Sequence, residues 1–381
     1  MKDGWQSSTL AETCEMYQPK TISGKEMVEG GEYPVFGANG IIGRYDKFNH
    51  EDPQLLITCR GATCGSVNIS EPRSWITGNA MVVRPKDAVI DMRFLEYLFR
   101  GGIDISKAIT GAAQPQITRT NLGPLEIRYP ESLAEQRRIV GILDEAFEGI
   151  ATAKANAEKN LQNARALFDT FLNTVYLGRG ADAWPKRRLG DVFEIGSSKR
   201  IHERDWSPAG VPFYGGKEIV KLAKFGHAVS NAYISEQKYH EYASKYDMPK
   251  PGDILITARG TIGVGYIVQK SDKFYYKDGN IISMRAKEAA DPHYLLYAFR
   301  STALAAQLGD LSGATVTHLP LAKAKELLLR MPDMDMQNAT AQRIIEFENE
   351  TQRLESIYQR KLAALDDLKK SLLHQAFSGE L

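Results

Sequence analysis

One order of short motifs runs through this chain of 381 residues twice. The order is kept in both halves, while the loops between the motifs vary in length. A repeat of this size is too long for one unit of a solenoid, and it indicates a duplicated domain. Two similar domains usually lie about a pseudo-twofold axis, so we expect a two-sided partner. The clearest pairs are Leu56–Gly61 with Leu255–Gly260, Gly78–Asn79 with Gly279–Asn280, Phe94–Arg100 with Tyr294–Arg300, Gly111–Ala112 with Gly313–Ala314, and Gln136–Arg137 with Gln342–Arg343.

Size and composition are those of an ordinary globular chain with room for two or three domains. Apolar residues make up 43% and charged residues 25% of the chain. We find no N-terminal apolar run of the signal type and no long apolar stretch, so we expect a cytoplasmic protein without membrane contact. Cys14, Cys59 and Cys64 make neither a disulfide framework nor a good zinc site, and we expect reduced, mostly buried thiols.

The formal net charge of +1 hides an asymmetry between the two copies. Residues 1–134 contain 14 Lys and Arg against 16 Asp and Glu, whereas residues 184–332 contain 22 against 15. A basic second domain fits a polyanionic partner, because each cation near a phosphate releases counterions. A solvated basic surface would explain the same count, and the first domain gives no such signal.

Each copy begins with a mixed region of short strands and helices. Apolar runs broken by Gly, Pro and Asn predict the strands, and longer periodic runs predict the helices. The predicted strands are Gln54–Thr58, Leu125–Arg128, Ile254–Thr257, Gly265–Val268 and Ala324–Arg330, and the predicted helical stretches are Met92–Arg100 and Pro292–Leu308.

Each copy ends in one long helix with a heptad seam. Apolar residues recur at alternating spacings of four and three from Ile139 and again from Ile344, with Asn160 and Lys361 at equivalent polar positions. We expect the two helices to pair antiparallel; the alternative is that each folds back on its own domain. Gly178 and Gly379 fit C-terminal helix caps. The residues expected to pack in the seam are Leu143, Ile150, Leu167, Leu354, Leu365 and Leu368.

The predicted fold is therefore α+β, with two similar mixed α/β domains separated by two long antiparallel coiled-coil helices in a pseudo-twofold arrangement. The predicted boundaries are 1–130 for the first domain, 131–178 for the first helix, 179–183 for the linker, 184–332 for the second domain and 333–381 for the second helix.

Motifs of known catalytic sites are missing from the sequence. It has no phosphate-binding P-loop, no nucleophile elbow, no His-Glu-x-x-His and no motif of an amino-directed methyltransferase. The seven histidines are scattered, and none pairs with Cys or a carboxylate at ligand spacing. The polar residues shared by both copies suit hydrogen bonding and phosphate contact better than acid–base chemistry, which favours a binding protein. They are Arg60/Arg259, Thr58/Thr257, Asn79/Asn280, Arg84/Arg285, Arg100/Arg300 and Gln136/Gln342.

The order of several phrases, together with the repeat and the heptad helices, resembles the DNA-specificity subunit of type I restriction–modification systems over essentially the whole chain. The second copy departs from the pattern at Val211–Lys217, at Gly313–His318 and at Met331–Gln337. The phrases are Tyr33–Gly43, Leu56–Ala62, Gly111–Ile117, Glu135–Val140 with Leu143–Asp144, and the tail Leu372–Leu381.

The resemblance implies two target-recognition domains that each read half of a split site in double-stranded DNA. It implies that the helices dock two methyltransferase subunits, which carry S-adenosylmethionine, and that ATP-dependent restriction subunits can join. No cofactor is then expected on this chain. The departures in the second copy are expected if the two half-sites differ.

Candidates for reading DNA are polar side chains on Gly-rich loops, where the backbone can approach the duplex. Arg60 and Arg259 follow apolar strands at matched positions, which favours a structural or phosphate role over base reading. Gln114 and Gln116 can alternatively satisfy the backbone of their own loop. The candidates are Asn39, Arg44, Arg60, Gln114, Gln116 and Arg119 in the first copy, and Lys199, Arg200, Lys217, Arg259, Thr261 and His318 in the second.

The sequence leaves two main hypotheses of different functional classes and a third, structural one. The first is a DNA-specificity adaptor, and the second is a stand-alone DNA-modifying or DNA-cleaving enzyme with an unrecognised site. A structural coiled-coil scaffold that does not touch nucleic acid is a third. Turnover by the isolated chain would separate the enzyme from the adaptor.

Overall fold

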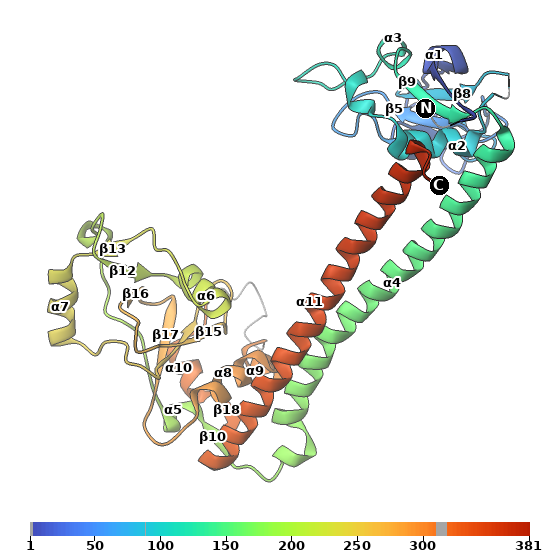
Figure 1. Ribbon diagram of the computed structural model, residues 1–381. Coiled ribbons are helices and arrows are strands. Elements are labelled where there is room, and N and C mark those ends of the chain that lie inside the picture. Colours follow the sequence, from blue (N-terminus) through green and yellow to red (C-terminus); the bar gives the residue numbers. More distant parts are fainter. Residues whose placement is uncertain (1–2, 88, 310–317) are drawn as a thin grey trace. The chain divides into compact units, whose positions relative to one another are not determined.

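The computed structural model describes residues 3–87, 89–309 and 318–381 and divides the chain into two compact units. Unit 1 is made of Met1–Glu158 with Gln359–Leu381, and unit 2 is Lys159–Tyr358. The long helices α4 (Leu133–Leu177) and α11 (Met334–Ser378) each pass through both units (Figure 1). Each unit therefore contains one mixed domain and a part of both long helices.

Three small sheets form the mixed domain of unit 1, with strand orders β1-β9, β2-β8-β5-β6 and β4-β3-β7. The pairs are antiparallel except β3 with β7. The elements are β1 (Trp5–Thr9), α1 (Leu10–Thr13), β2 (Cys14–Tyr17), β3 (Tyr33–Gly37), β4 (Gly40–Tyr45), β5 (Leu55–Thr58), β6 (Val67–Ile69), β7 (Trp75–Ile76), β8 (Ala80–Pro85), α2 (Met92–Tyr97), the π-helical turn η1 (Leu98–Gly102), the 3-10 turn η2 (Ile105–Ala108), α3 (Arg119–Leu122) and β9 (Glu126–Pro130).

Unit 2 repeats this topology strand for strand, with orders β10-β18, β11-β17-β14-β15 and β13-β12-β16. The shared fold of the two copies is thus confirmed. Unit 2 adds helix α6, which packs mainly on β14 and β15, and helix α7, which packs on the three-stranded sheet. The elements are η3 (Arg179–Ala181), β10 (Lys186–Arg188), α5 (Leu189–Val192), β11 (Phe193–Gly196), η4 (Glu203–Asp205), β12 (Val211–Tyr214), α6 (Gly216–Phe225), β13 (Tyr233–Ile234), α7 (Glu236–Lys245), β14 (Ile254–Thr257), β15 (Gly265–Ile267), β16 (Tyr275–Tyr276), β17 (Ile281–Ala286), α8 (Pro292–Arg300), α9 (Thr302–Gly309), α10 (Leu321–Glu326) and β18 (Leu328–Arg330).

The same local signals start equivalent elements in both units. Asp91 caps α2 by accepting hydrogen bonds from the amides of Arg93 and Phe94, and Asp291 caps α8 by accepting one from the amide of Tyr294. Pro292 stands in the first turn of α8, where a missing amide hydrogen costs nothing. The central strands β5 and β14 are buried at every residue, as their uninterrupted apolar sequences predict.

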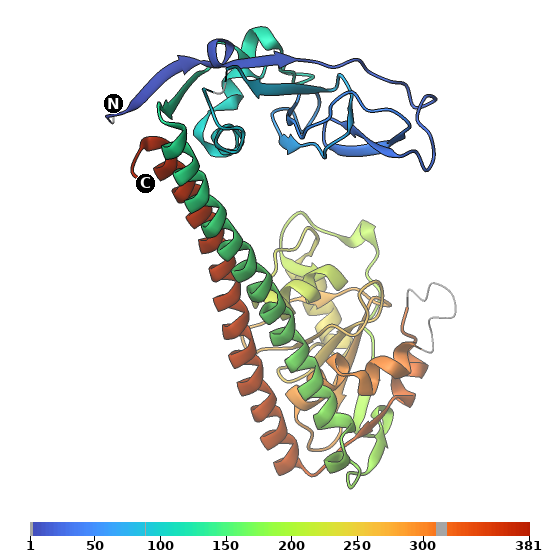
Figure 2. The same cartoon turned by 90° about the vertical axis from the view of Figure 1, so that its right-hand side faces the viewer.

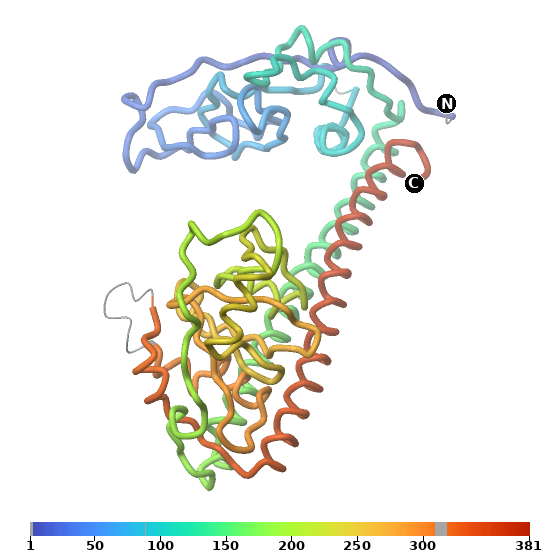
Figure 3. Tube along the Cα trace, turned by 90° about the vertical axis from the view of Figure 1, so that its left-hand side faces the viewer, coloured from blue at the N-terminus to red at the C-terminus, as the bar shows by residue number. Residues whose placement is uncertain are grey.

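The long helices belong to the hydrophobic cores of both units. In unit 1, Leu143 at the start of α4 and Leu373 at the end of α11 share one buried cluster. In unit 2, Leu172 at the end of α4 and Ile344 at the start of α11 share another. Within each unit, the two helices lie side by side and run in opposite directions, as expected (Figures 2 and 3). Ion pairs link them within each unit, from Lys154 to Asp366 at 2.7 Å and from Arg165 to Glu355 at 2.9 Å.

Half of the predicted seam is wrong by one residue. Leu143 and Ile150 are buried and Leu365 is half-buried, but Leu167, Leu354 and Leu368 are 52%, 40% and 47% exposed. The second buried row lies one position further along each helix. It contains charged residues, and the aliphatic stem of Lys154 or Glu355 fills its place at the edge of the seam. The buried or half-buried residues of this row include Phe147, Lys154, Leu161, Phe168 and Val175 in α4, and Glu348, Glu355, Leu362 and Ala376 in α11.

Other seam expectations also change. Asn160 and Lys361, the equivalent polar positions of the predicted seam, are both exposed and do not pack in it. Arg165 and Glu355, which lie outside the predicted seam, form an ion pair with each other. Gly379 has a φ of 81°, as expected for a left-handed cap, whereas Gly178 has an ordinary φ of −69°. Gly178 still donates a hydrogen bond to the carbonyl of Thr174.

Two assignments in the mixed domains also need correction. Ala324–Glu326 belongs to helix α10, so the expected strand shortens to β18. Gln136 corresponds to Gln337, not to Gln342. Each of these buried glutamines accepts a hydrogen bond from the amide of the Asp that caps α2 or α8, and each donates one to a proline carbonyl. Gln342 is exposed and bonds Glu346 on its own helix.

Candidate nucleic-acid interface

The backbone around the repeated arginine Arg60 has the same hydrogen-bonded arrangement as the backbone around Arg259, and we call this arrangement the shared frame. Each arginine follows the last residues of a buried central strand, β5 or β14. Arg60 forms an isolated antiparallel bridge with Gln116, and Arg259 forms the same bridge with His318. The residue before each arginine is bonded to the repeated asparagine. The amide of Cys59 donates a hydrogen bond to the carbonyl of Asn79 at 3.2 Å, and the amide of Ala258 donates one to the carbonyl of Asn280 at 2.8 Å.

Strand alternation directs these arginines outward. Cys59 and Ala258 are buried, so the side chains that follow them must leave the core on the opposite face. The structure accordingly leaves Arg60 and Arg259 exposed. The two sites are alike because the same core positions fix both.

Unlike the other repeated arginines, Arg60 and Arg259 form no ion pair within the described residues. Arg84 binds Glu15 at 2.7 Å, and Arg285 binds Asp253 and Asp247. Arg100 and Arg300 bind Glu96 and Glu348 at 2.9 and 2.8 Å. An exposed, unpaired guanidinium next to a Gly-containing loop is suited to phosphate contact.

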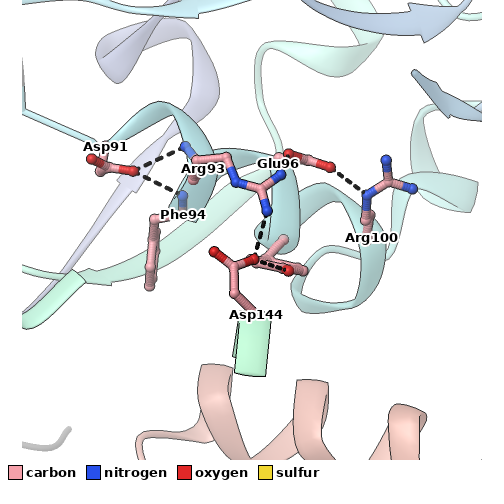
Figure 4. Close-up of polar contacts among 7 residues, drawn as sticks. Asp91, Arg93, Phe94, Glu96, Arg100 and Asp144 are labelled. Carbon is pink, nitrogen blue, oxygen red and sulfur yellow. Dashed lines mark hydrogen bonds and ion pairs between the residues drawn. The ribbon is translucent and has the colours of Figure 1, made fainter. Parts of the chain in front are cut away.

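The arginines that form ion pairs have a structural role, which unit 1 illustrates. Figure 4 shows Arg93 and Arg100 on either side of Glu96, and Arg93 also reaches Asp144 on α4. Tyr97 donates a hydrogen bond to the same Asp144 carboxylate. Burial, followed by this hydrogen bond and charge, raises the pKa of Tyr97 to about 12. These contacts fasten α2 to α4 and leave Arg100 unsuited to DNA contact.

The remaining first-copy candidates divide into free and engaged side chains. Gln114, Gln116 and Arg119 are exposed on the segment that faces the Arg60 loop or follows it. Asn39, at the tip of the β3–β4 hairpin, donates to the Thr63 hydroxyl at 2.7 Å. Arg44 instead donates to the carbonyls of Gly31 and Glu32. Its guanidinium holds a turn, which makes it a poor choice for reading DNA.

Five of the six second-copy candidates line two adjoining cavities that share Arg259 and Asn280. One cavity of about 520 Å³ includes Lys217 and Thr261, and the other of about 340 Å³ includes Arg200 and His318. Lys199 is exposed outside both, with its ammonium over the ring of Tyr246. Arg200 binds Asp278 at 2.9 Å, and both are among the residues that line the smaller cavity.

Sequence reasoning missed Trp206, Lys277 and Asn280 as members of this site. Trp206 and Lys277 line the smaller cavity, with the ammonium 5.8 Å from the centre of the indole ring. No motif marks Trp206 or Lys277, because loops far apart in sequence bring them together. Asn280 did have a signal, since it is one of the repeated polar residues.

The described residues contain no cluster of three or more His, Cys, Asp or Glu that could hold a metal ion. Cys14, Cys59 and Cys64 are free thiols, two of them buried and Cys64 half-buried. Across the same described ranges, no helix combines the length and the apolar character needed to cross a membrane. The departure Gly313–Thr317 lies outside the described residues.

A family model described as the type I restriction modification DNA specificity domain matches residues 2–162 and again residues 181–361. The chain belongs to this family. Its two matches span the two copies of the shared frame, and the DNA-recognition function expected from the sequence is therefore that of the family.

Curated relatives agree with the family assignment of this specificity subunit. A protein of Haemophilus influenzae named "Putative type I restriction enzyme specificity subunit" is 27% identical over 84% of this chain and 81% of its own length. The EcoprrI specificity subunit of Escherichia coli is 28% identical over 41% of this chain and 40% of its own length.

Solved structures support the fold. The HsdS subunit of Thermoanaerobacter tengcongensis matches with a TM-score of 0.68 and 17% identity, over 100% of this chain and 98% of that one. A chain from the structure concerning complex assembly and conformational transition of the type I R-M system matches with a TM-score of 0.78 and 18% identity, over 100% and 99%.

Proposed function

We propose that this specificity subunit is a non-catalytic reader of a bipartite DNA site, with one half-site read by each unit. The observation that carries the proposal is the duplicated frame, in which an exposed, unpaired arginine faces a polar residue that differs between the copies. Base contacts specify sequence whereas phosphate contacts position the protein, and the frame contains candidates for both.

The proposal extends to two adenine-methyltransferase subunits that dock on the paired helices. Leu167 and Leu368 support it, because they hold equivalent positions in the two copies and both expose about half of their side chains. Leu354 adds exposed apolar surface in unit 2. Exposed leucines on an otherwise polar helix pair are the kind of surface that a partner covers.

In this proposal the chemistry belongs to the partners. The methyltransferase subunits carry S-adenosylmethionine, the restriction subunits use ATP, and this chain holds no cofactor of its own. Its polar clusters support this division, since the contacts in Figure 4 are ion pairs and helix caps that fasten one element to another. Because the target is chromosomal DNA, we propose a cytoplasmic location.

The catalytic division is tested by assaying the purified chain alone and then with its methyltransferase and S-adenosylmethionine. We expect adenine methylation at a bipartite sequence only when the methyltransferase is added. Methylation or cleavage by the chain alone would contradict the adaptor function and favour a stand-alone enzyme.

Docking is tested by measuring the mass of the complex in solution for Leu167→Asp and Leu368→Asp. We expect the wild-type chain to bind two methyltransferases, each single variant to bind one, and the double variant to bind neither. Leu328→Asp is the matched control, because Leu328 is similarly exposed at 44% but lies on strand β18. A saturated wild-type ratio of one would contradict two equivalent docking faces.

A further inference from the structure

The two copies of the frame around Arg60 and Arg259 can be aligned residue by residue, which allows this single chain to be compared with itself. The carbonyls of Cys59 and Ala258 accept hydrogen bonds from the amides of Ile117 and Leu319, at 2.9 and 2.7 Å. Together with the matching bridges, these bonds make Gln116 and His318 equivalent positions. The backbone is the same in both copies, and the side chain is not.

We propose that positions 116 and 318 are the paired specificity positions of the protein, where Gln116 reads a base in one half-site and His318 reads a different base in the other. The inference rests on the proposed two-reader function and names the residues through which the halves differ. Arg60 and Arg259, which do not differ, hold the phosphate backbone in both halves.

The side chain of Gln116 is presented outward by a rigid backbone. Its own amide and carbonyl form hydrogen bonds with Thr110 at 2.8 and 2.9 Å, on the side away from Arg60. Ile117 is buried at 2% exposure, so alternation sends Gln116 to the outer face beside Arg60. Within the described ranges, no other residue bonds its side-chain amide. A fixed backbone with a free amide is suited to base reading, because binding then has to order only the side chain.

His318 is equally well placed, in a more enclosed setting. It lines the cavity of about 340 Å³ with Arg259, Trp206 and Asn280. Its Nδ1 atom is buried and has no hydrogen-bond partner in the described part of the chain. An unsatisfied buried ring nitrogen is unusual in a native protein and calls for an explanation beyond packing. Recognition of a ligand in the adjoining cavity provides one.

The two side chains differ in what they can recognise. Glutamine offers a donor and an acceptor in one plane, which match N7 and N6 of adenine in the major groove. A neutral histidine donates from one ring nitrogen and accepts at the other, so it makes a single contact to a base edge, such as donation to O6 or N7 of guanine. We therefore expect adenine at the position read by Gln116 and a base with an exposed acceptor at the position read by His318.

The test exchanges the two residues in the full chain, assembled with its methyltransferase. Gln116→His and His318→Gln are each expressed in cells, and the methylated sequences are read across the genome. We expect Gln116→His to lower the preference for adenine roughly 5- to 150-fold at one position of one half-site, the range for losing one bidentate contact. His318→Gln should change one position of the other half only. Gln237→His on α7 is the control for the substitution itself.

Unchanged bases in both halves would overturn the proposal while leaving the two-reader function intact. A single substitution that changes bases in both halves would contradict the proposal and the two-reader function together. If a variant methylates too little DNA for its target to be determined, its complex is used to select bound sequences from a DNA library with one randomised half-site. Selected sequences identical to those of the wild type would then show that the residue does not read a base. Failure of the two-reader function is distinct, because the wild-type complex itself would then show no bipartite site.

Discussion

Units 1 and 2 have the same strand orders but differ at the connection beside their three-stranded sheets. In unit 1, β3 turns directly into β4, and Asn39 lies at the tip of that hairpin. In unit 2, helix α6 takes this place between β12 and β13, and α7 follows. Asn39 accepts a hydrogen bond from the Thr58 hydroxyl, and Lys217 of α6 lines a cavity with the equivalent Thr257.

The insertion accounts for part of the charge difference between the copies. Lys217, Lys221 and Lys224 all belong to α6, which has no counterpart in unit 1. Duplication therefore preserved the frame that positions the arginines and left the neighbouring connection free to change. We therefore propose that the shared scaffold positions the DNA and that the variable connection sets the strength and the chemistry of the contact.

The largest expected effect comes from replacing residues 184–332 with the same region of another specificity subunit. One half of the methylated sequence should change completely while the other half is kept, because base contacts act locally. Genome-wide methylation mapping checks this. A replacement that alters both halves would break the comparison between two independent readers.

The next largest effect is expected from substitution of the two buried glutamines, Gln136 and Gln337. Gln136→Ala leaves the amide of Asp91 and the carbonyls of Val89 and Pro130 without this hydrogen-bond partner. Gln337→Ala does the same to one amide and one carbonyl. We expect losses of about 2–4 kcal/mol in the free energy of unfolding, the larger for Gln136→Ala. Urea unfolding measures both. Exposed Gln162→Ala on α4 is the control, and losses below about 0.5 kcal/mol would contradict the buried hydrogen-bonding role of the two glutamines.

High pH should destabilise unit 2 before unit 1. Burial raises the pKa of Tyr276 to about 12 and raises those of Tyr266, Tyr275 and Tyr294 further. A raised folded-state pKa adds stability that is present below the unfolded value of about 10. This stability is lost as the pH rises toward the folded value, and it amounts to roughly 2.7 kcal/mol for a two-unit shift.

This alkaline loss is measured by urea unfolding at pH 8 and pH 11, with tryptophan fluorescence restricted to one unit at a time. Removing Trp184 and Trp206 leaves Trp5 and Trp75 to report on unit 1, and the reverse variant reports on unit 2. In unit 1, Tyr97→Phe should reduce the loss. Equal losses in both units would mean that the buried tyrosines do not distinguish them.

The smallest effect is expected from the shared arginines. Arg60→Ala and Arg259→Ala should each lower DNA affinity about tenfold on many sequences alike and reduce the salt slope by about one. Binding of the assembled complex is measured against salt, with Arg73→Ala as the control for an exposed arginine that is paired with Glu51. A loss confined to the cognate sequence would show that the arginine reads a base.

Local pattern predicted the fold more fully than it predicted the site. The strand at Ile254–Thr257 and the helix start at Met92 were right, because apolar runs and Asp caps act within a few residues. The seam was misassigned at Leu354 because it is more apolar than its half-buried neighbour Glu355, and at Leu167 because it and the buried Phe168 are both apolar, so the pattern does not separate them. Helices α6 and α7 were not predicted, although Gly226 and Ser235 carry the cap signals.

The grouping of the site needed tertiary structure. Arg60 and Gln116 are far apart in sequence, and only the bridge between them shows that they act together. The bonds of Arg44 to two carbonyls were equally invisible, because main-chain acceptors leave no trace in the side-chain pattern. Whether the named residues contact DNA stays a prediction.

The division of both long helices between the units has a consequence for synthesis on the ribosome. Unit 2 is one continuous stretch, Lys159–Tyr358, whereas unit 1 needs Gln359–Leu381 as well as its first 158 residues. Leu373 and Ala376 fill the core that Ile139 and Leu143 line. A nascent chain therefore exposes that core until these late residues emerge, so the first domain to be translated is the last to be completed.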